Sequence, residues 1–232
     1  MDDGEVGHPI VAQRRFGPAP KGSVRRVAKS IRLDERLRVH ASGIDGKVFE
    51  SYQGVRIQRS APIRLYRFEQ FFQGFENTPP IRKLFGKNAG RILRALQVEF
   101  FSPPFGYMGT SDVDGHLIVS SHHLKTSDLR TLYLDVVHEL CHVKQFRAGR
   151  PLFDRKKKYV DSPTEIEAYA FTVQEGKRLG MTEAELLAYL EVEWVDARDH
   201  RRLARRLGLL RKGSRRAAKP GRPRHHRARR GK

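Results

Sequence analysis

The chain has 232 residues, of which 38% are hydrophobic and 31% charged, a composition that predicts one globular domain with a highly charged surface. Its single cysteine excludes an intrachain disulfide, and no apolar run is long enough to span a bilayer. The formal net charge of +20 is concentrated at one end, because residues 200–232 carry 15 Lys and Arg and no acidic residue.

Residues 1–25 are predicted to form a flexible leader that precedes a domain spanning residues 26–212. The leader contains Gly and Pro but no apolar stretch of the kind that a secretory signal needs. Because the chain also has no membrane segment and no disulfide, we expect a cytoplasmic protein.

The first half of the domain is expected to supply a small sheet and its backing helix. Residues 47–52 and 54–59 have short strand character, and residues 91–101 fit an amphipathic helix that ends before two prolines. Between them lies a cluster of aromatic residues that is predicted to be core rather than a ligand pocket: Phe68, Phe71, Phe72 and Phe75.

A β-hairpin is predicted next, with strands at residues 105–110 and 116–121 joined by the turn at residues 112–115. The strand at residues 116–121 is expected to lie at the edge of the sheet, and two interpretations of this edge remain open. An extended peptide could add to it through main-chain hydrogen bonds. Alternatively, it is an ordinary edge strand whose polar residues discourage aggregation.

A long helix is predicted that begins near Asp128 and ends at Gly149-Arg150-Pro151. Thr126, Ser127 and Asp128 offer an N-cap, apolar residues then recur with helical spacing, and Gly149 and Pro151 end the element.

This helix carries the sequence His138-Glu139-Leu140-Cys141-His142. Residues at positions i and i+4 lie one above the other on a helix, so both imidazoles can reach one point while Glu139 borders the same face. This is the pattern of a zinc site with two ligands and a general base. Cys141, between the histidines, is expected to pack as a small buried residue.

A catalytic zinc takes three protein ligands, and the third is expected on a second helix that begins with Pro163. Glu165 lies 23 residues after His142, and Glu167 is the second candidate. A structural alternative competes, because Ser162 and Glu165 also form a capping-box pattern in which the glutamate bonds back to the cap.

The two motif helices resemble those of gluzincin-like metallopeptidases, in which a His-Glu-x-x-His helix is completed by a glutamate on the next helix. In many members this glutamate opens a Glu-x-x-Ala-Asp or Glu-x-x-Ala-Asn segment, whose Glu and Ala are matched by Glu165 and Ala168. The resemblance implies Glu165 rather than Glu167 as third ligand, a Zn²⁺ cofactor, and an α+β, zincin-like fold with a small mixed or antiparallel sheet. Tyr169 stands in place of the Asp or Asn, so the group that orients a zinc-bound histidine must come from elsewhere.

The helices also look like those of short bacterial domains with a His-Glu-Leu-x-His-Val-x-Gln helix and a Pro-x-Glu-x-Glu-Ala-Tyr helix. The resemblance covers about residues 105–180 and leaves the substrate open.

Such a site implies peptide hydrolysis. Zinc lowers the pKa of a bound water to about 7, and Glu139 would accept the proton of this water and pass it to the leaving amine. A second donor usually stabilises the negative charge of the tetrahedral intermediate. The candidates for this donor are Tyr159, Tyr169, His122 and His123.

The C-terminal part is predicted to hold helices from the capping-box pattern at Thr182 and Glu185 to about Leu210, with a break in the 190s. Residues 213–232 are nearly free of apolar side chains and are expected to be disordered and attracted to nucleic acid. Within them, Lys219-Pro220-Gly221-Arg222-Pro223-Arg224 resembles the core of an AT-hook.

Three functional interpretations follow. The first is a zinc-dependent peptidase acting on a protein or peptide substrate. The second is a DNA-associated protein that works through residues 213–232, with an inactive or secondary protease-like fold. The third is a chance His-Glu-x-x-His pattern on an ordinary core helix.

Overall fold

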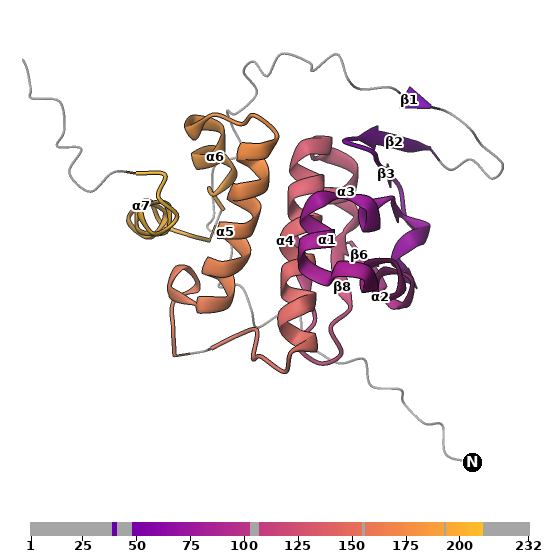
Figure 1. Cartoon of the computed structure of the whole chain (residues 1–232), viewed down its shortest axis with the longest axis horizontal. Helices are drawn as coiled ribbons and strands as arrows, with labels where there is room; N and C mark the ends of the chain where they lie inside the picture. Colours follow the sequence, from indigo (N-terminus) through magenta and orange to yellow (C-terminus); the bar gives the residue numbers. More distant parts are fainter. Residues whose placement is uncertain (1–38, 41–47, 103–106, 155, 193, 211–232) are drawn as a thin grey trace, which may run out of the picture.

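The computed structural model describes residues 39–40, 48–102, 107–154, 156–192 and 194–210. The predicted leader, residues 1–25, and the predicted basic tail, residues 213–232, lie outside these residues. The described part has a mixed α+β architecture with two small sheets and several helices (Figure 1).

The first sheet is antiparallel throughout, with strand order β1-β2-β3-β5. Its strands are β1 (Val39–His40), β2 (Phe49–Tyr52), β3 (Val55–Gln58) and β5 (Phe72–Gln73). The predicted strands near residues 47–52 and 54–59 are therefore confirmed. They form a hairpin whose two turn residues, Gln53 and Gly54, both have positive φ, as the twist of a two-residue hairpin requires.

The second sheet is mixed, with strand order β4-β6-β8-β7. Its strands are β4 (Leu65–Arg67), β6 (Gln97–Phe101), β7 (Met108–Thr110) and β8 (Leu117–Ser120). The β6–β8 pair is parallel, and the other two pairs are antiparallel. β7 and β8 form the predicted hairpin. The expectation that the strand at residues 116–121 lies at the sheet edge is wrong, because β8 pairs with both β6 and β7 and the edge strand is β7.

The prediction of one helix over residues 91–101 is wrong. The helix α2 (Ala89–Ala95) ends before this segment is complete, and Gln97–Phe101 forms the strand β6. Along this strand exposed and buried residues alternate, and Val98 and Phe100 are fully buried. The period of two and the β-branched and aromatic side chains favour a strand, and pairing with β4 and β8 gives it partners on both sides.

Seven α-helices are described, together with four short 3₁₀ turns. The helices are α1 (Pro79–Phe85), α2 (Ala89–Ala95), α3 (Ser121–Thr126), α4 (Leu129–Arg147), α5 (Pro163–Arg178), α6 (Glu183–Tyr189) and α7 (Ala197–Arg206). The turns are η2 (Phe68–Gln70), η3 (Phe75–Asn77), η4 (Gly86–Asn88) and η5 (Tyr159–Asp161). The break predicted in the 190s is confirmed between α6 and α7.

The long helix α4 occupies the middle of the molecule. Figure 1 shows it between α5 and α6 on one side and the strands with α1, α2 and α3 on the other. Its N-terminus is capped as predicted, because the Asp128 side chain accepts a hydrogen bond of 3.0 Å from the backbone N–H of Thr131. Packing on both sides buries most of α4, which makes polar side chains on it available to internal sites.

The hydrophobic core has two parts. The larger part joins the sheets, α1 to α3 and most of the buried residues of α4, and the smaller part lies among α5, α6 and α7. The aromatic residues predicted as core are 0–3% exposed, which confirms the prediction for Phe68, Phe71, Phe72 and Phe75. Among the described residues, no helix combines the length and the apolar character that a membrane crossing needs.

Gly115 links the β7–β8 hairpin to α4. It has a φ of +78°, and a Cβ at this position would lie 2.4 Å from the ring of Phe146 on α4. Gly149 also has positive φ, +71°, but a Cβ there meets nothing within 4 Å.

We expect Gly115→Ala to lower the free energy of unfolding by about 3 kcal/mol, since left-handed strain of about 1–2 kcal/mol adds to an overpacked contact of about 1–3 kcal/mol. The matched control, Gly149→Ala, has the strain alone and should lose about 1–2 kcal/mol. Urea denaturation of both variants tests this expectation. Equal losses would show that the Phe146 contact does not constrain the hairpin.

Candidate metal centre

The two histidines of the motif are buried on α4 and face the same point. His138 is 6% exposed and His142 is 3% exposed, and their Nε2 atoms lie 3.1 Å apart. One helical turn separates the two residues, so the sequence spacing alone brings the rings together. The second half of α4 is buried on several faces, which places this pair inside the protein rather than at its surface.

Glu165 on α5 completes the cluster. Its Oε2 atom lies 3.4 Å from Nε2 of His138 and 3.4 Å from Nε2 of His142. The capping box that competed for this glutamate does not form, because the Ser162 side chain makes no cap hydrogen bond and pairs with Thr164 Oγ1 at 2.8 Å. Glu165 is therefore not engaged at the helix end and points into the α4–α5 interface.

Glu167, the second candidate, points to a different group of residues. Its carboxylate accepts a hydrogen bond from Gln145 Nε2 at 3.1 Å and a short ion-paired contact from Arg150. Burial tends to raise the pKa of Glu167, but the Arg150 guanidinium outweighs it and holds the pKa below the usual value. The structure therefore places Glu165 in the cluster and Glu167 beside it.

The three side chains fit a metal ion. A tetrahedral zinc ion with bonds of about 2.0–2.1 Å separates its ligand atoms by about 3.3 Å. The three ligand atoms here are separated by 3.1, 3.4 and 3.4 Å. Glu165 Oε2 is also buried without a well-formed hydrogen bond, as expected of an atom whose partner is an ion. His138, His142 and Glu165 thus lie close enough to hold one metal ion.

Within the cluster, Glu165 and His142 carry opposite charges. Burial tends to raise the pKa of Glu165, but the facing His138 and His142 outweigh it and lower the pKa well below its usual range. Burial tends to lower the pKa of His142, but contacts with Glu165 and Glu139 raise it to about 9. His142 therefore keeps its proton near neutral pH.

Metal binding must displace that proton, because a ligating imidazole offers a lone pair. Below the raised pKa of about 9 for His142, we expect the metal affinity to rise about tenfold for each unit of pH increase. Competition against a chelator of known proton affinity at pH 6, 7 and 8 measures this slope. An affinity that stays constant over this interval would contradict the proposed proton displacement.

Gln145 orients His142. The Nδ1 of His142 donates a hydrogen bond to Gln145 Oε1 at 2.8 Å, which turns its Nε2 toward the cluster. Gln145 Nε2 in turn donates to the backbone carbonyl of Thr164 and to Glu167, both at 3.1 Å. Gluzincin-like proteins often orient a zinc-bound histidine with an Asp at the position that Tyr169 occupies in this chain. The signal for Gln145 was its position three residues after His142 on the same helix face.

We expect Gln145→Leu to weaken metal binding by about 10- to 100-fold, because the His142 ring loses the acceptor that fixes its orientation. Gln174→Leu, on the exposed side of α5, is the matched control and should bind metal as the wild type does. Competition with a chromophoric chelator compares the three proteins. Wild-type affinity in Gln145→Leu would rule out the orienting role.

Glu139 is held by the edge strand β7. Thr110 Oγ1 donates a hydrogen bond of 2.8 Å to its Oε2 and also lies 3.2 Å from its backbone carbonyl. Burial raises the pKa of Glu139, while His142, His138 and Thr110 act in the opposite direction. A carboxylate with a raised pKa suits a group that takes up and returns a proton near neutral pH. The sequence pattern did not reveal Thr110, because its contact to Glu139 depends on packing of β7 against α4.

A cavity of about 410 Å³ adjoins the cluster and is lined by His138, Glu139, Tyr159 and Tyr169, among others. The two tyrosine hydroxyls lie 2.9 Å apart, and the Tyr169 ring packs edge-on against the His138 ring at 4.4 Å between centroids. Burial raises the pKa of both tyrosines well above the usual value, so both keep their protons. Both tyrosine candidates for the oxyanion donor therefore line this cavity.

The two histidine candidates for the oxyanion donor are differently placed. His123 lines the cavity, but its Nε2 donates to Asp135 Oδ2 at 2.7 Å and its Nδ1 pairs with Ser127 Oγ at 2.8 Å. His122 is exposed on α3 and does not line the cavity. Cys141 is buried, and burial raises the pKa of its thiol to about 12, in agreement with the predicted packing role.

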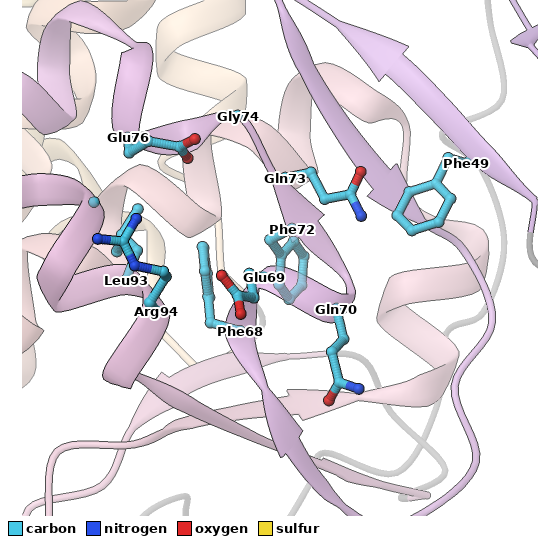
Figure 2. A pocket seen from close by; sticks show the side chains of 11 residues that line it. Phe49, Phe68, Glu69, Gln70, Phe72, Gln73, Gly74, Glu76, Leu93 and Arg94 are labelled. Atoms are coloured by element: carbon cyan, nitrogen blue, oxygen red, sulfur yellow. The ribbon is translucent and has the colours of Figure 1, made fainter.

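A larger cavity of about 530 Å³ lies elsewhere, among β2, β5 and α2. Figure 2 shows Glu69, Gln73 and Arg94 around the rings of Phe68 and Phe72. None of the residues of the candidate metal centre lines it, so it does not share the chemistry of that centre.

Comparison with known proteins identified no relative: no family model, no curated protein and no solved structure matches the chain.

Proposed function

We propose that the protein is a zinc-dependent peptidase of the gluzincin-like, zincin-fold type. The observation that carries the proposal is the convergence of His138, His142 and Glu165 on one point, with Glu139 beside them. A donor set of two imidazoles and one carboxylate in a tetrahedral spacing suits Zn²⁺, and it leaves the fourth position for water. A chance motif on a core helix would not require a buried carboxylate from another helix to face both imidazoles.

In the proposed mechanism, Glu139 moves the proton. When bound, zinc acidifies a water molecule and polarises the carbonyl group of the substrate. Glu139 accepts the proton of the attacking water and then delivers it to the nitrogen of the leaving amine. Thr110 holds the Glu139 carboxylate toward the cavity throughout both transfers.

Tyr159 and Tyr169 are the proposed donors to the oxygen that becomes negative during the attack. Their hydroxyls are protonated, paired with one another and located in the cavity that contains Glu139. A donor already in place when charge develops stabilises it without a cost of reorganisation.

Peptides are the proposed substrates because the cavity borders an edge strand. In the β7–β8 pair, Tyr107 O accepts from Ser120 N and Ser111 N donates to His116 O. Antiparallel strands alternate in this way, so the backbone groups of Met108, between these positions, point away from β8. Met108 and Tyr107 both line the cavity, so an extended peptide that pairs with this edge would pass beside Glu139.

We expect Glu139→Gln to retain about one zinc per chain and to abolish hydrolysis of a protein substrate such as casein, because the amide cannot accept a proton. Glu69→Gln, in the larger cavity, is the control and should retain both properties. Metal content is measured by mass spectrometry of the purified proteins, and hydrolysis by release of soluble peptides. Full activity in Glu139→Gln would remove the proposed base.

Nucleic-acid binding through residues 213–232 and a cytoplasmic location remain predictions from the sequence. The tail lies outside the described residues, and none of the contacts described above bears on it.

A further inference from the structure

The cavity beside the metal centre has a charge opposite to that of the chain. Its lining includes four carboxylates besides Glu139, and one arginine. These residues are Asp128, Asp135, Glu185, Glu191 and Arg130. The whole chain carries a formal charge of +20, so an acidic cavity does not follow from its composition.

Two of the four carboxylates are engaged within the protein. Asp135 accepts hydrogen bonds from His123 at 2.7 Å and from Tyr189 at 2.9 Å. Glu185 caps α6 and pairs with Arg130 at 3.1 Å, which also neutralises the only arginine of the lining.

The other two carboxylates are exposed, and among the described residues neither Asp128 nor Glu191 forms an ion pair. Asp128 caps α4 by accepting hydrogen bonds of 3.0 and 2.6 Å from Thr131, but no cation among the described residues neutralises its charge. Asp128 and Glu191 come from different elements, the N-terminus of α4 and the segment after α6, yet line the same cavity.

Aromatic rings accompany these carboxylates in the cavity lining. The lining contains Tyr107, Tyr159, Tyr189 and Trp194. Trp194 is 42% exposed, and its indole meets the Tyr159 ring at 6.1 Å between centroids. Aromatic faces combined with carboxylates attract cations, and guanidinium and ammonium groups on long aliphatic stems most of all.

We propose, on the basis of the peptidase function proposed above, that this cavity selects peptides with an Arg or Lys side chain close to the scissile bond. Asp128 and Glu191 are the residues that determine this specificity. Glu139 lines the same cavity, so a cationic side chain held by these carboxylates would keep the peptide beside the proposed base. A glutamate at the same position of the peptide is repelled, because its negative charge faces the negative charges of these carboxylates.

The test uses two quenched-fluorescent peptides that differ only in one central residue, Arg or Glu. We expect the wild type to cleave the Arg peptide with a kcat/KM about tenfold higher than the Glu peptide. Adding salt should reduce this ratio, because both carboxylates are exposed. Preference for the Glu peptide, or a ratio near one, would overturn the inference.

The specificity residues are tested in the double variant Asp128→Asn with Glu191→Gln. Asparagine is as good an N-cap as aspartate, so α4 keeps its cap while the charge is removed. We expect the ratio to fall below about threefold in this variant and to stay at the wild-type value in Glu183→Gln, an exposed residue of α6 outside the cavity. An unchanged ratio in the double variant would contradict the assignment to Asp128 and Glu191.

A measurement of peptide binding distinguishes failure of this specificity proposal from failure of the proposed peptidase function. Fluorescence anisotropy with Glu139→Gln measures the affinity of each peptide without turnover. Tighter binding of the Arg peptide, together with an absence of hydrolysis in the wild type, would support the cation preference and overturn the peptidase proposal. Hydrolysis of both peptides at equal rates would support the peptidase proposal and overturn the cation preference. If neither peptide is bound or cleaved, both proposals fail.

Discussion

The contact of one buried carboxylate with two buried imidazoles is the interaction on which the rest of the site depends. Glu165 is 4% exposed, and an isolated charge at such a depth is strongly unfavourable. His138 and His142 compensate it from the neighbouring helix, so the packing of α4 against α5 and the polar cluster require one another. Removal of either histidine would leave the buried Glu165 carboxylate with only one imidazole partner, and loss of a partner of a buried charge is strongly destabilising.

Polar contacts from three separate elements hold the cluster in position. β7 contributes Thr110 to Glu139, α4 contributes Gln145 to His142, and the start of α5 contributes the carbonyl of Thr164 to Gln145. These contacts fix side-chain orientation within a site whose helices alone would leave the rings free to turn. They also explain why the register of α5 matters. A shift of one residue turns a helical side chain by about 100°, which would take Glu165 out of the interface.

The surroundings of the centre differ from the rest of the molecule in charge as well as in shape. Acidic and aromatic side chains gather in the cavity at the metal centre, whereas the chain as a whole is strongly basic. An acidic cavity of this kind attracts cationic ligands.

Local sequence signals determined the α4 helix with its Asp128 cap, the pairing of His138 with His142, the hairpin of β7 and β8, and the buried phenylalanines. These features depend on residues close together in the chain, where helical or alternating periodicity carries the information. Only the tertiary structure decided between Glu165 as a cap and as a partner of the imidazoles, made Gln97–Phe101 a strand, and brought Thr110 to Glu139. Each of these outcomes depends on a group contributed by a distant segment, and a single sequence does not record such contacts.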